Sequence, residues 1–132
     1  MKTSSQPCRS GFSLVEVLAA ITIIGIITFM AIPNIVQLKT DGEENLARSR
    51  AEALNLAIAS YVQASGAAAA QTAWTAANNE ARYDLIAPYI SFAQADLSNG
   101  FMPGGYSATL PTTINPLSTK TTLTGPSGTI SY

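Results

Sequence analysis

The sequence has no histidine and a single cysteine, Cys8, among its 132 residues. Without histidine, it lacks the side chain that most often acts as a general base near neutral pH and a principal nitrogen ligand for metals. One cysteine cannot form an intramolecular disulfide. No small apolar stretch of the kind that precedes a lipid-modified cysteine comes before Cys8, so we interpret it as incidental.

Catalytic motifs are also missing. The acidic residues are scattered, and no serine or threonine lies in a recognisable nucleophile motif. We therefore expect no enzymatic activity, no cofactor and no metal site.

Charge is scarce, at 11% of residues against 47% apolar residues. The formal net charge is -1, and two of the seven basic residues, Lys2 and Arg9, lie in the first eleven positions. Without them, five basic residues (7 - 2) remain against eight acidic ones, a balance of -3. Nucleic-acid-binding surfaces need clustered Lys and Arg, so we expect no nucleic-acid partner.

One long segment carries no charge at all, from Val17 to Leu38. As a helix it would span roughly 33 Å at about 1.5 Å per residue, enough to cross a bilayer core. It is longer than the apolar region of a secretory signal, and a buried core helix rarely runs so far without a charge. The basic residues before it favour a cytoplasmic N-terminus, although Lys39 on the other flank opposes this.

Glu16 argues against a plain membrane anchor, which is the main alternative. A carboxylate in an apolar span costs up to about 3 kcal/mol, less near the interface. No basic residue follows Glu16 within reach along the helix. We therefore expect its partner on another chain or at a chain terminus.

The run Arg-Ser-Gly-Phe-Ser-Leu-Val-Glu, residues 9–16, resembles the processing site of type IV prepilins and type II secretion pseudopilins. The resemblance implies that a prepilin peptidase cuts between Gly11 and Phe12 and that Phe12 is then N-methylated. Glu16 would be the fifth residue of the cut chain. A buried carboxylate is tolerable when paired, so Glu16 could meet the Phe12 amine of a neighbouring subunit and fix the axial register.

Gly25 and Pro33 lie inside the apolar segment. Proline removes a helical hydrogen bond and bends or loosens a helix. The resemblance implies that the helix melts between these two residues on assembly, as in some pili of this class. Simple tolerance is the alternative, because both residues are common in membrane helices.

We predict an α+β, pilin-like fold, in which a long N-terminal helix packs on a small antiparallel sheet. Thr40 with Glu43 and Asp41 with Glu44 have capping-box spacing and could restart a helix after Gly42. Together with the apolar span, we expect one long helix with soft points at Pro33 and Gly42. We expect this later helical segment to have an apolar face formed by Leu46, Ala53, Leu54, Ala57, Ile58 and Tyr61. The predicted regions are a leader over 1–11, a membrane or filament-core helix over 12–38, an amphipathic continuation over 39–65 and a globular head over 66–132.

Within the head, Gly66 should end the long helix, and a short helix should cover residues 80–90 and close near Pro88. Strands are predicted over 106–110, 120–124 and 129–132, with a turn at 125–128. A flexible, threonine-rich tail without regular secondary structure is the alternative. The expected head core consists of Trp74, Tyr83, Leu85, Ile86, Tyr89, Ile90 and Phe92.

The resemblance implies a structural subunit of a type IV pilus-like filament, and a pseudopilin serving protein export is the leading hypothesis. The alternatives are a surface pilin for adhesion, motility or DNA uptake, and a monomeric single-span binding protein. The chain departs from standard major subunits of both systems. It cannot form the C-terminal disulfide of many pilins, and no acidic residue follows Asp96 to bind the calcium of many pseudopilins.

The resemblance also implies partners and a location. The partners are copies of the chain, other pilin-like subunits, the prepilin peptidase, an inner-membrane assembly platform and, before assembly, membrane lipid. The location is the bacterial inner membrane, in a single pass, and then a periplasmic or cell-surface filament.

Overall fold

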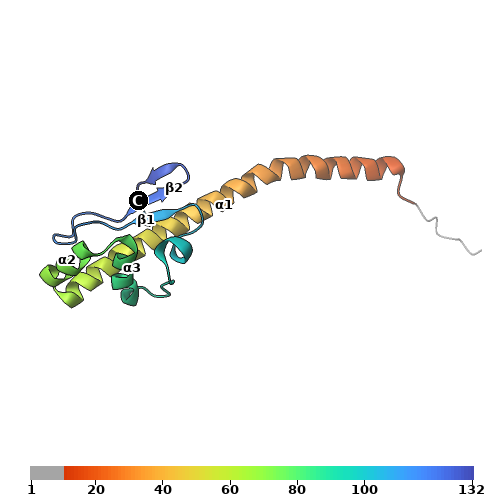
Figure 1. Ribbon diagram of the computed structural model, residues 1–132. Helices are drawn as coiled ribbons and strands as arrows, with labels where there is room; N and C mark the ends of the chain where they lie inside the picture. Colours follow the sequence, from red (N-terminus) through yellow and green to blue (C-terminus); the bar gives the residue numbers. More distant parts are fainter. Residues whose placement is uncertain (1–10) are drawn as a thin grey trace, which may run out of the picture. The chain divides into compact units, whose positions relative to one another are not determined.

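A computed structural model describes residues 11–132. Most of the predicted leader, including Lys2, Cys8 and Arg9, lies outside the described residues. The chain divides into two compact units, one ending at Lys39 and one covering Thr40–Tyr132. Helix α1, Leu14–Ser65, contributes its N-terminal segment to the first unit and its C-terminal segment to the other (Figure 1).

The N-terminal segment of α1 starts directly after Ser13. The Ser13 carbonyl oxygen accepts hydrogen bonds from the amides of Glu16 at 3.0 Å and Val17 at 3.1 Å. The hydroxyls of Thr22 and Thr28 each donate to the carbonyl four residues earlier, at 2.8 Å. These threonines therefore satisfy their polar groups within the helix, which makes them compatible with an apolar environment.

The predicted long helix is confirmed, because α1 runs without a break from Leu14 to Ser65, and the capping-box spacing near Gly42 does not start a separate helix there. Glu44 and Arg48 lie one turn apart on the continuous helix and form an ion pair at 2.5 Å. Such pairs support a helix that is already formed. A continuous hydrogen-bond ladder satisfies the backbone here without the side-chain caps that a new helix start would need.

The C-terminal segment of α1 buries a single face in the head. The prediction is confirmed for Leu54, Ala57, Ile58 and Tyr61 but wrong for Leu46, which is 44% exposed. Ala53 is only partly buried. The face continues instead through two small residues that were not predicted, Ala47 and Ala51. Alanine lets neighbouring backbone come close to the helix, and hydrophobicity alone does not reveal that role.

The helical elements after α1 follow the predicted breaks. Gly66 ends α1 with φ 81°, a value that favours glycine. Then come α2, Ala67–Ala76; α3, Asn79–Ile86; and the 3-10 turn η1, Ala87–Tyr89, which contains Pro88. The side chain of Asn78 caps α3 by accepting from the Ala81 amide at 2.9 Å. The π turn η2, Leu97–Phe101, was not predicted.

The C-terminal region of the chain forms a sheet, so the alternative of a flexible tail is wrong. Strands β1, Ser107–Thr109; β2, Thr122–Gly125; and β3, Gly128–Ile130 pair antiparallel in the order β1-β2-β3. Gly125 pairs with Gly128 across the predicted turn. Ala108 and Leu123 face each other on β1 and β2 and are both buried. Each strand is shorter than predicted.

The head core lies between the C-terminal segment of α1, the short helices and the sheet. Of the predicted core residues, Trp74, Tyr83 and Ile86 are fully buried, and Leu85 and Ile90 pack against the core. Tyr89 and Phe92 are corrections, because they are 42% and 93% exposed. They lie in and after η1, where the chain turns away from the helix pattern on which the prediction relied. The fold is α+β and pilin-like, as predicted.

Candidate functional site: the N-terminal segment and the clamps of the head

Gly11 and Phe12 precede α1 and are exposed. A Cβ added to Gly11 would meet no atom within 4 Å, so nothing in the described fold requires glycine there. The Phe12 side chain is 86% exposed. The peptide bond between these residues therefore lies in non-helical, accessible chain, as a protease substrate requires.

Glu16 lies in the first turn of α1. Unpaired amides at a helix N-terminus attract negative charge, so this position favours a carboxylate. Glu16 is exposed, and across residues 11–132 it has no ion-pair partner in the same chain. Pairing with a neighbouring chain stays a prediction, because one chain by itself cannot contain that contact.

The side chains after Glu16 form an exposed apolar surface. The helix is long and apolar enough to cross a membrane, with a mean hydropathy of 2.4 over an 18-residue window in which no residue is buried. Its start has a shallow apolar hollow, lined by Phe12, Leu14, Val17, Leu18 and Ile21. An apolar surface of this extent marks a site for lipid or for other protein chains.

Gly25 and Pro33 both lie within α1, which continues through them. Pro33 has no amide hydrogen, so the carbonyl of Phe29 loses the partner that it would have in a regular helix. A Cβ added to Gly25 would meet no atom within 4 Å. The missing hydrogen bond is a built-in weak point, and melting there on assembly stays a prediction.

Helix side chains hold the backbone of the C-terminal region in the head. Asn79 donates to the Ala108 carbonyl at 3.0 Å and accepts from the Leu110 amide at 2.8 Å, much as a neighbouring strand would. Gln71 accepts from the amides of Ile114 and Asn115 at 2.7 and 3.0 Å. Trp74 donates its indole N–H to the Pro111 carbonyl at 2.7 Å. We call Asn79, Gln71 and Trp74 the helix clamps.

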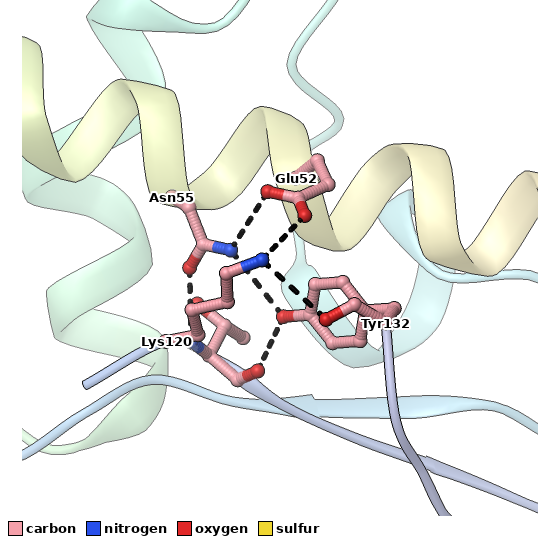
Figure 2. Close-up of polar contacts among 5 residues, drawn as sticks. Glu52, Asn55, Lys120 and Tyr132 are labelled. Carbon is pink, nitrogen blue, oxygen red and sulfur yellow. Dashed lines mark hydrogen bonds and ion pairs between the residues drawn. The ribbon is translucent and has the colours of Figure 1, made fainter.

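A polar cluster fixes the last strand region to α1 (Figure 2). The Lys120 ammonium donates to Glu52 Oε1 at 2.8 Å, and the amide of Asn55 donates to Glu52 Oε2 at 3.2 Å. Asn55 Oδ1 accepts from the Thr121 amide at 2.9 Å, and the Tyr132 hydroxyl donates to the Thr121 carbonyl. The hydrogen bond from Lys120 lowers the pKa of Glu52 and raises the pKa of Lys120.

Neither the clamps nor this cluster was predicted from the sequence. Their members are separated by up to 77 residues, as for Asn55 and Tyr132, and no local pattern marks them. Among residues 11–132 no group of three or more metal-ligating His, Cys, Asp or Glu side chains comes together. The polar groups of the cluster instead tie structural elements to one another.

Comparison with known proteins agrees with the interpretation of the N-terminal segment. Residues 7–32 match the family model of the prokaryotic N-terminal methylation motif. No curated protein and no solved structure matches the chain. This motif is the prepilin-type signature of type IV pilins and pseudopilins. Proteins with this motif form a structural family and not a catalytic one. The match supports the assignment of this chain to the type IV pilin-like or pseudopilin proteins. It implies processing by a prepilin peptidase and assembly with pilin-like subunits in general.

Proposed function

We propose that this chain is a structural subunit of a type IV pilus-like filament and that it acts as a pseudopilin in type II protein secretion. The observation that carries the filament role is a lone carboxylate, Glu16, at the start of the exposed apolar segment of α1, which follows an accessible Gly11–Phe12 junction. A plain anchor needs the apolar helix but neither the junction nor the carboxylate.

Processing and assembly are linked in this proposal. Cleavage after Gly11 creates a positive α-amine at Phe12, four residues before Glu16. When apolar helices of neighbouring subunits pack together, water is excluded and an unpaired charge becomes costly. Pairing Glu16 of one subunit with the Phe12 amine of the next compensates both charges. This pairing can form only when neighbouring helices are shifted along the filament axis by one particular distance. The pairing therefore also sets the axial register of the subunits.

Before assembly, lipid would cover the apolar segment of α1, with the N-terminus on the cytoplasmic side of the bacterial inner membrane and the head outside. During assembly, an inner-membrane platform would pass the subunit to the filament, where other chains replace lipid. The missing hydrogen bond at Pro33 lowers the cost of local unwinding in that transfer. Gly25 adds backbone freedom at the other end of the same stretch.

The export role is the finer level of the proposal. Its support is the lack of any cysteine after Cys8, which removes the C-terminal disulfide found in many surface pilins. No acidic residue follows Asp96 to bind the calcium of many major pseudopilins, so the proposed pseudopilin is one without that calcium site. A surface pilin is the competing assignment within the same class.

Mass spectrometry of two fractions from the native cells tests both levels: filaments sheared from the surface, and membranes. A peptide that starts at methylated Phe12 and occurs in membranes but not among sheared filaments supports a pseudopilin. If the same peptide is abundant among sheared filaments, the chain is a surface pilus subunit and the proposed export role is wrong. If the chain still starts at Met1 in both fractions, the proposal of a filament subunit is rejected, and a plain membrane anchor becomes the better interpretation.

A further inference from the structure

Phe92 is the most exposed large apolar side chain of the head, at 93%, and its backbone has φ 62°. Among the described residues it is the one non-glycine residue with a positive φ. A bulky side chain in this conformation is sterically unfavourable. Phe92 therefore combines a strained backbone with an aromatic ring in solvent, and neither feature stabilises the isolated head.

The surrounding structure holds this conformation in place. The Tyr83 hydroxyl donates to the Gln94 carbonyl at 2.9 Å and accepts from the Gln94 amide at 3.1 Å. The Ile90 amide donates to the Ala87 carbonyl at 3.1 Å. Phe92 lies between these two hydrogen-bonded points of the chain. Persistent strain of this kind is a pointer to function.

A hollow that can receive an aromatic ring lies elsewhere on the head. It has a volume of about 210 Å³ and is lined by Asn55, Leu117, Ser118, Thr119 and Lys120. A cavity of roughly 150 Å³ suffices for benzene. Leu117 is 45% exposed and offers an apolar wall, and the Lys120 ammonium already lies 5.2 Å from the ring centre of Tyr132. The same ammonium is held by Glu52 at 2.8 Å, so Leu117 forms the apolar wall of the hollow and Lys120 belongs to its polar edge.

The aromatic ring and the hollow lie on different flanks of α1. A second hollow of about 240 Å³, lined in part by Phe92 itself, includes Ser49, Arg50 and Ala53 of α1, whereas the receiving hollow includes Asn55. Ala53 and Asn55 are two positions apart, which places them roughly 200° apart around a helix. Figure 1 shows the same separation, with the chain that directly follows α3, up to η2, on one side of α1 and the strands on the other.

We propose that Phe92 of one subunit inserts into the hollow at Leu117 and Lys120 of the next subunit. A projecting residue that fits a pocket elsewhere on the same molecule makes a head-to-tail contact, which repeats without closing. This inference rests on the proposed filament, whose subunits all enter the membrane with the same orientation. A self-pairing contact of Phe92 with Phe92 would close after two copies and could not extend along a filament.

The size of the contact explains why the occupant is a copy already held nearby. One aromatic side chain buries about 150–250 Å², while a stable interface between free proteins buries roughly 800 Å² on each partner. Phe92 is too small to dimerise free heads. In an assembled filament, the packed N-terminal helices hold the heads at high effective concentration, and a small contact then forms.

Cysteine cross-linking in filaments tests the proposal, because the chain has no cysteine after Cys8. Chains that begin at Phe12 are scored after mild oxidation. The double variant Phe92→Cys/Thr119→Cys should give a disulfide ladder that extends beyond dimers, and each single variant should remain monomeric. The matched control is Thr72→Cys/Thr119→Cys, which places the first cysteine on an exposed position of α2 and should give no ladder.

The other outcomes overturn the proposal in distinguishable ways. Dimers of the Phe92→Cys single variant would mean a self-pairing contact. Assembled filaments without cross-links would reject the head contact and leave the filament function intact. Cross-links to a different protein would assign Phe92 to another partner. Absence of wild-type filaments would reject the proposed function and this contact together.

A second variant separates contact from folding. Phe92→Gly suits φ 62° and removes the ring, so thermal unfolding of the full chain in detergent should occur at the same temperature or higher. Filaments of this variant should break severalfold more readily under shear than wild-type filaments. Equal shear resistance would overturn the proposal, as would a clear loss of head stability, because Phe92 would then support the fold.

Discussion

Residues 14–39 and 40–65 belong to the same α-helix, yet they use their apolar side chains in opposite ways. In the N-terminal segment, large apolar residues point outward all around the helix, from Leu14 to Leu38, and none of the 18 most apolar consecutive residues is buried. In the C-terminal segment, a single face is buried in the head, and the other faces carry ions and amides. One face of the C-terminal segment is thus packed in the head, whereas the large apolar side chains of the N-terminal segment are exposed.

The difference shows which region needs an environment. The head, residues 40–132, has a core built on fully buried Leu54, Trp74 and Tyr83, together with the helix clamps. The large apolar side chains of the N-terminal segment are exposed, so we expect lipid or other chains to cover them. Substitutions in the N-terminal segment should therefore change processing and assembly, whereas substitutions in the head should change folding.

The largest expected effect is at the junction before the helix. We expect Gly11→Val to abolish processing, because a branched side chain replaces the smallest residue next to the cut. Gly25→Val is the matched control, since a Cβ at either glycine meets no atom within 4 Å in the isolated chain. Intact-mass measurement of membrane-inserted protein decides the result. Cleavage of Gly11→Val at the wild-type rate would remove Gly11 from the processing site.

Glu16→Ala should leave cleavage and membrane insertion intact but reduce assembly by about a hundredfold or more. Removing one partner of a buried ion pair costs roughly 3–5 kcal/mol, because the other charge is left uncompensated. In the proposed pairing, that charge is the amine of Phe12. The yield of filament relative to processed membrane subunit is the measurement.

Glu16→Gln refines this test. It keeps the shape of the side chain and loses only the charge, so it should fail in nearly the same way. If Glu16→Gln assembles like wild type, the side chain acts through hydrogen bonding or packing and not through its charge.

Leu54 and Leu56 allow the two uses of apolar residues to be compared within one turn of the head helix. Leu54 is 0% exposed and Leu56 is 71% exposed. We expect Leu54→Ala to lower the free energy of unfolding by about 2–5 kcal/mol and Leu56→Ala to change it by less than about 0.5 kcal/mol. Fluorescence of Trp74, which is the single tryptophan and is fully buried, reports unfolding of the head.

Leu18→Ala extends that comparison into the N-terminal segment. Leu18 is apolar and 58% exposed, so its truncation should leave head unfolding unchanged and weaken assembly. If Leu18→Ala destabilised the head as Leu54→Ala does, the division between a self-sufficient head and a dependent N-terminal segment would be wrong.

The sequence revealed more about the N-terminal segment than about the head, for a physical reason. A membrane-length apolar run and a short processing motif are local, so Gly11, Phe12 and Glu16 could be singled out from neighbouring residues. Strand positions and helix ends were also local, as at Gly66 and the Gly125–Gly128 turn. The head core depends on contacts across many residues, so Ala47 and Ala51 were missed and Phe92 was misplaced.

The polar contacts of the head were missed for the same reason. Asn79 is 29 residues from Ala108, and Lys120 is 68 residues from Glu52. Asparagine and lysine occur on any solvated surface, and only the folded chain shows which backbone groups or carboxylates they meet. The clamps hold a sheet of very short strands in place, a role that propensity does not encode.

The smallest expected effect concerns the acid stability of the head. The hydrogen bond from Lys120 lowers the pKa of Glu52 from its ordinary value of 4.5, and the hydrogen bond from Ser98 lowers the pKa of Glu80. A carboxyl whose pKa is lower in the folded state stabilises the fold above its unfolded pKa. That stabilisation is lost as the pH falls through the folded pKa. The head should therefore unfold at a lower temperature near pH ~3 than near pH ~7.

Both carboxyls are exposed, so the loss should be small, since solvent and salt screen surface ion pairs. Trp74 fluorescence during heating at a series of pH values measures it. Glu52→Gln should reduce the pH dependence of the unfolding temperature below the ordinary pKa of the carboxyl. The double variant Glu52→Gln/Glu80→Gln should reduce it further. An unchanged acid response in the double variant would show that neither carboxyl couples folding to pH, and the polar cluster would then act as a neutral positional tie between Asn55 and Thr121.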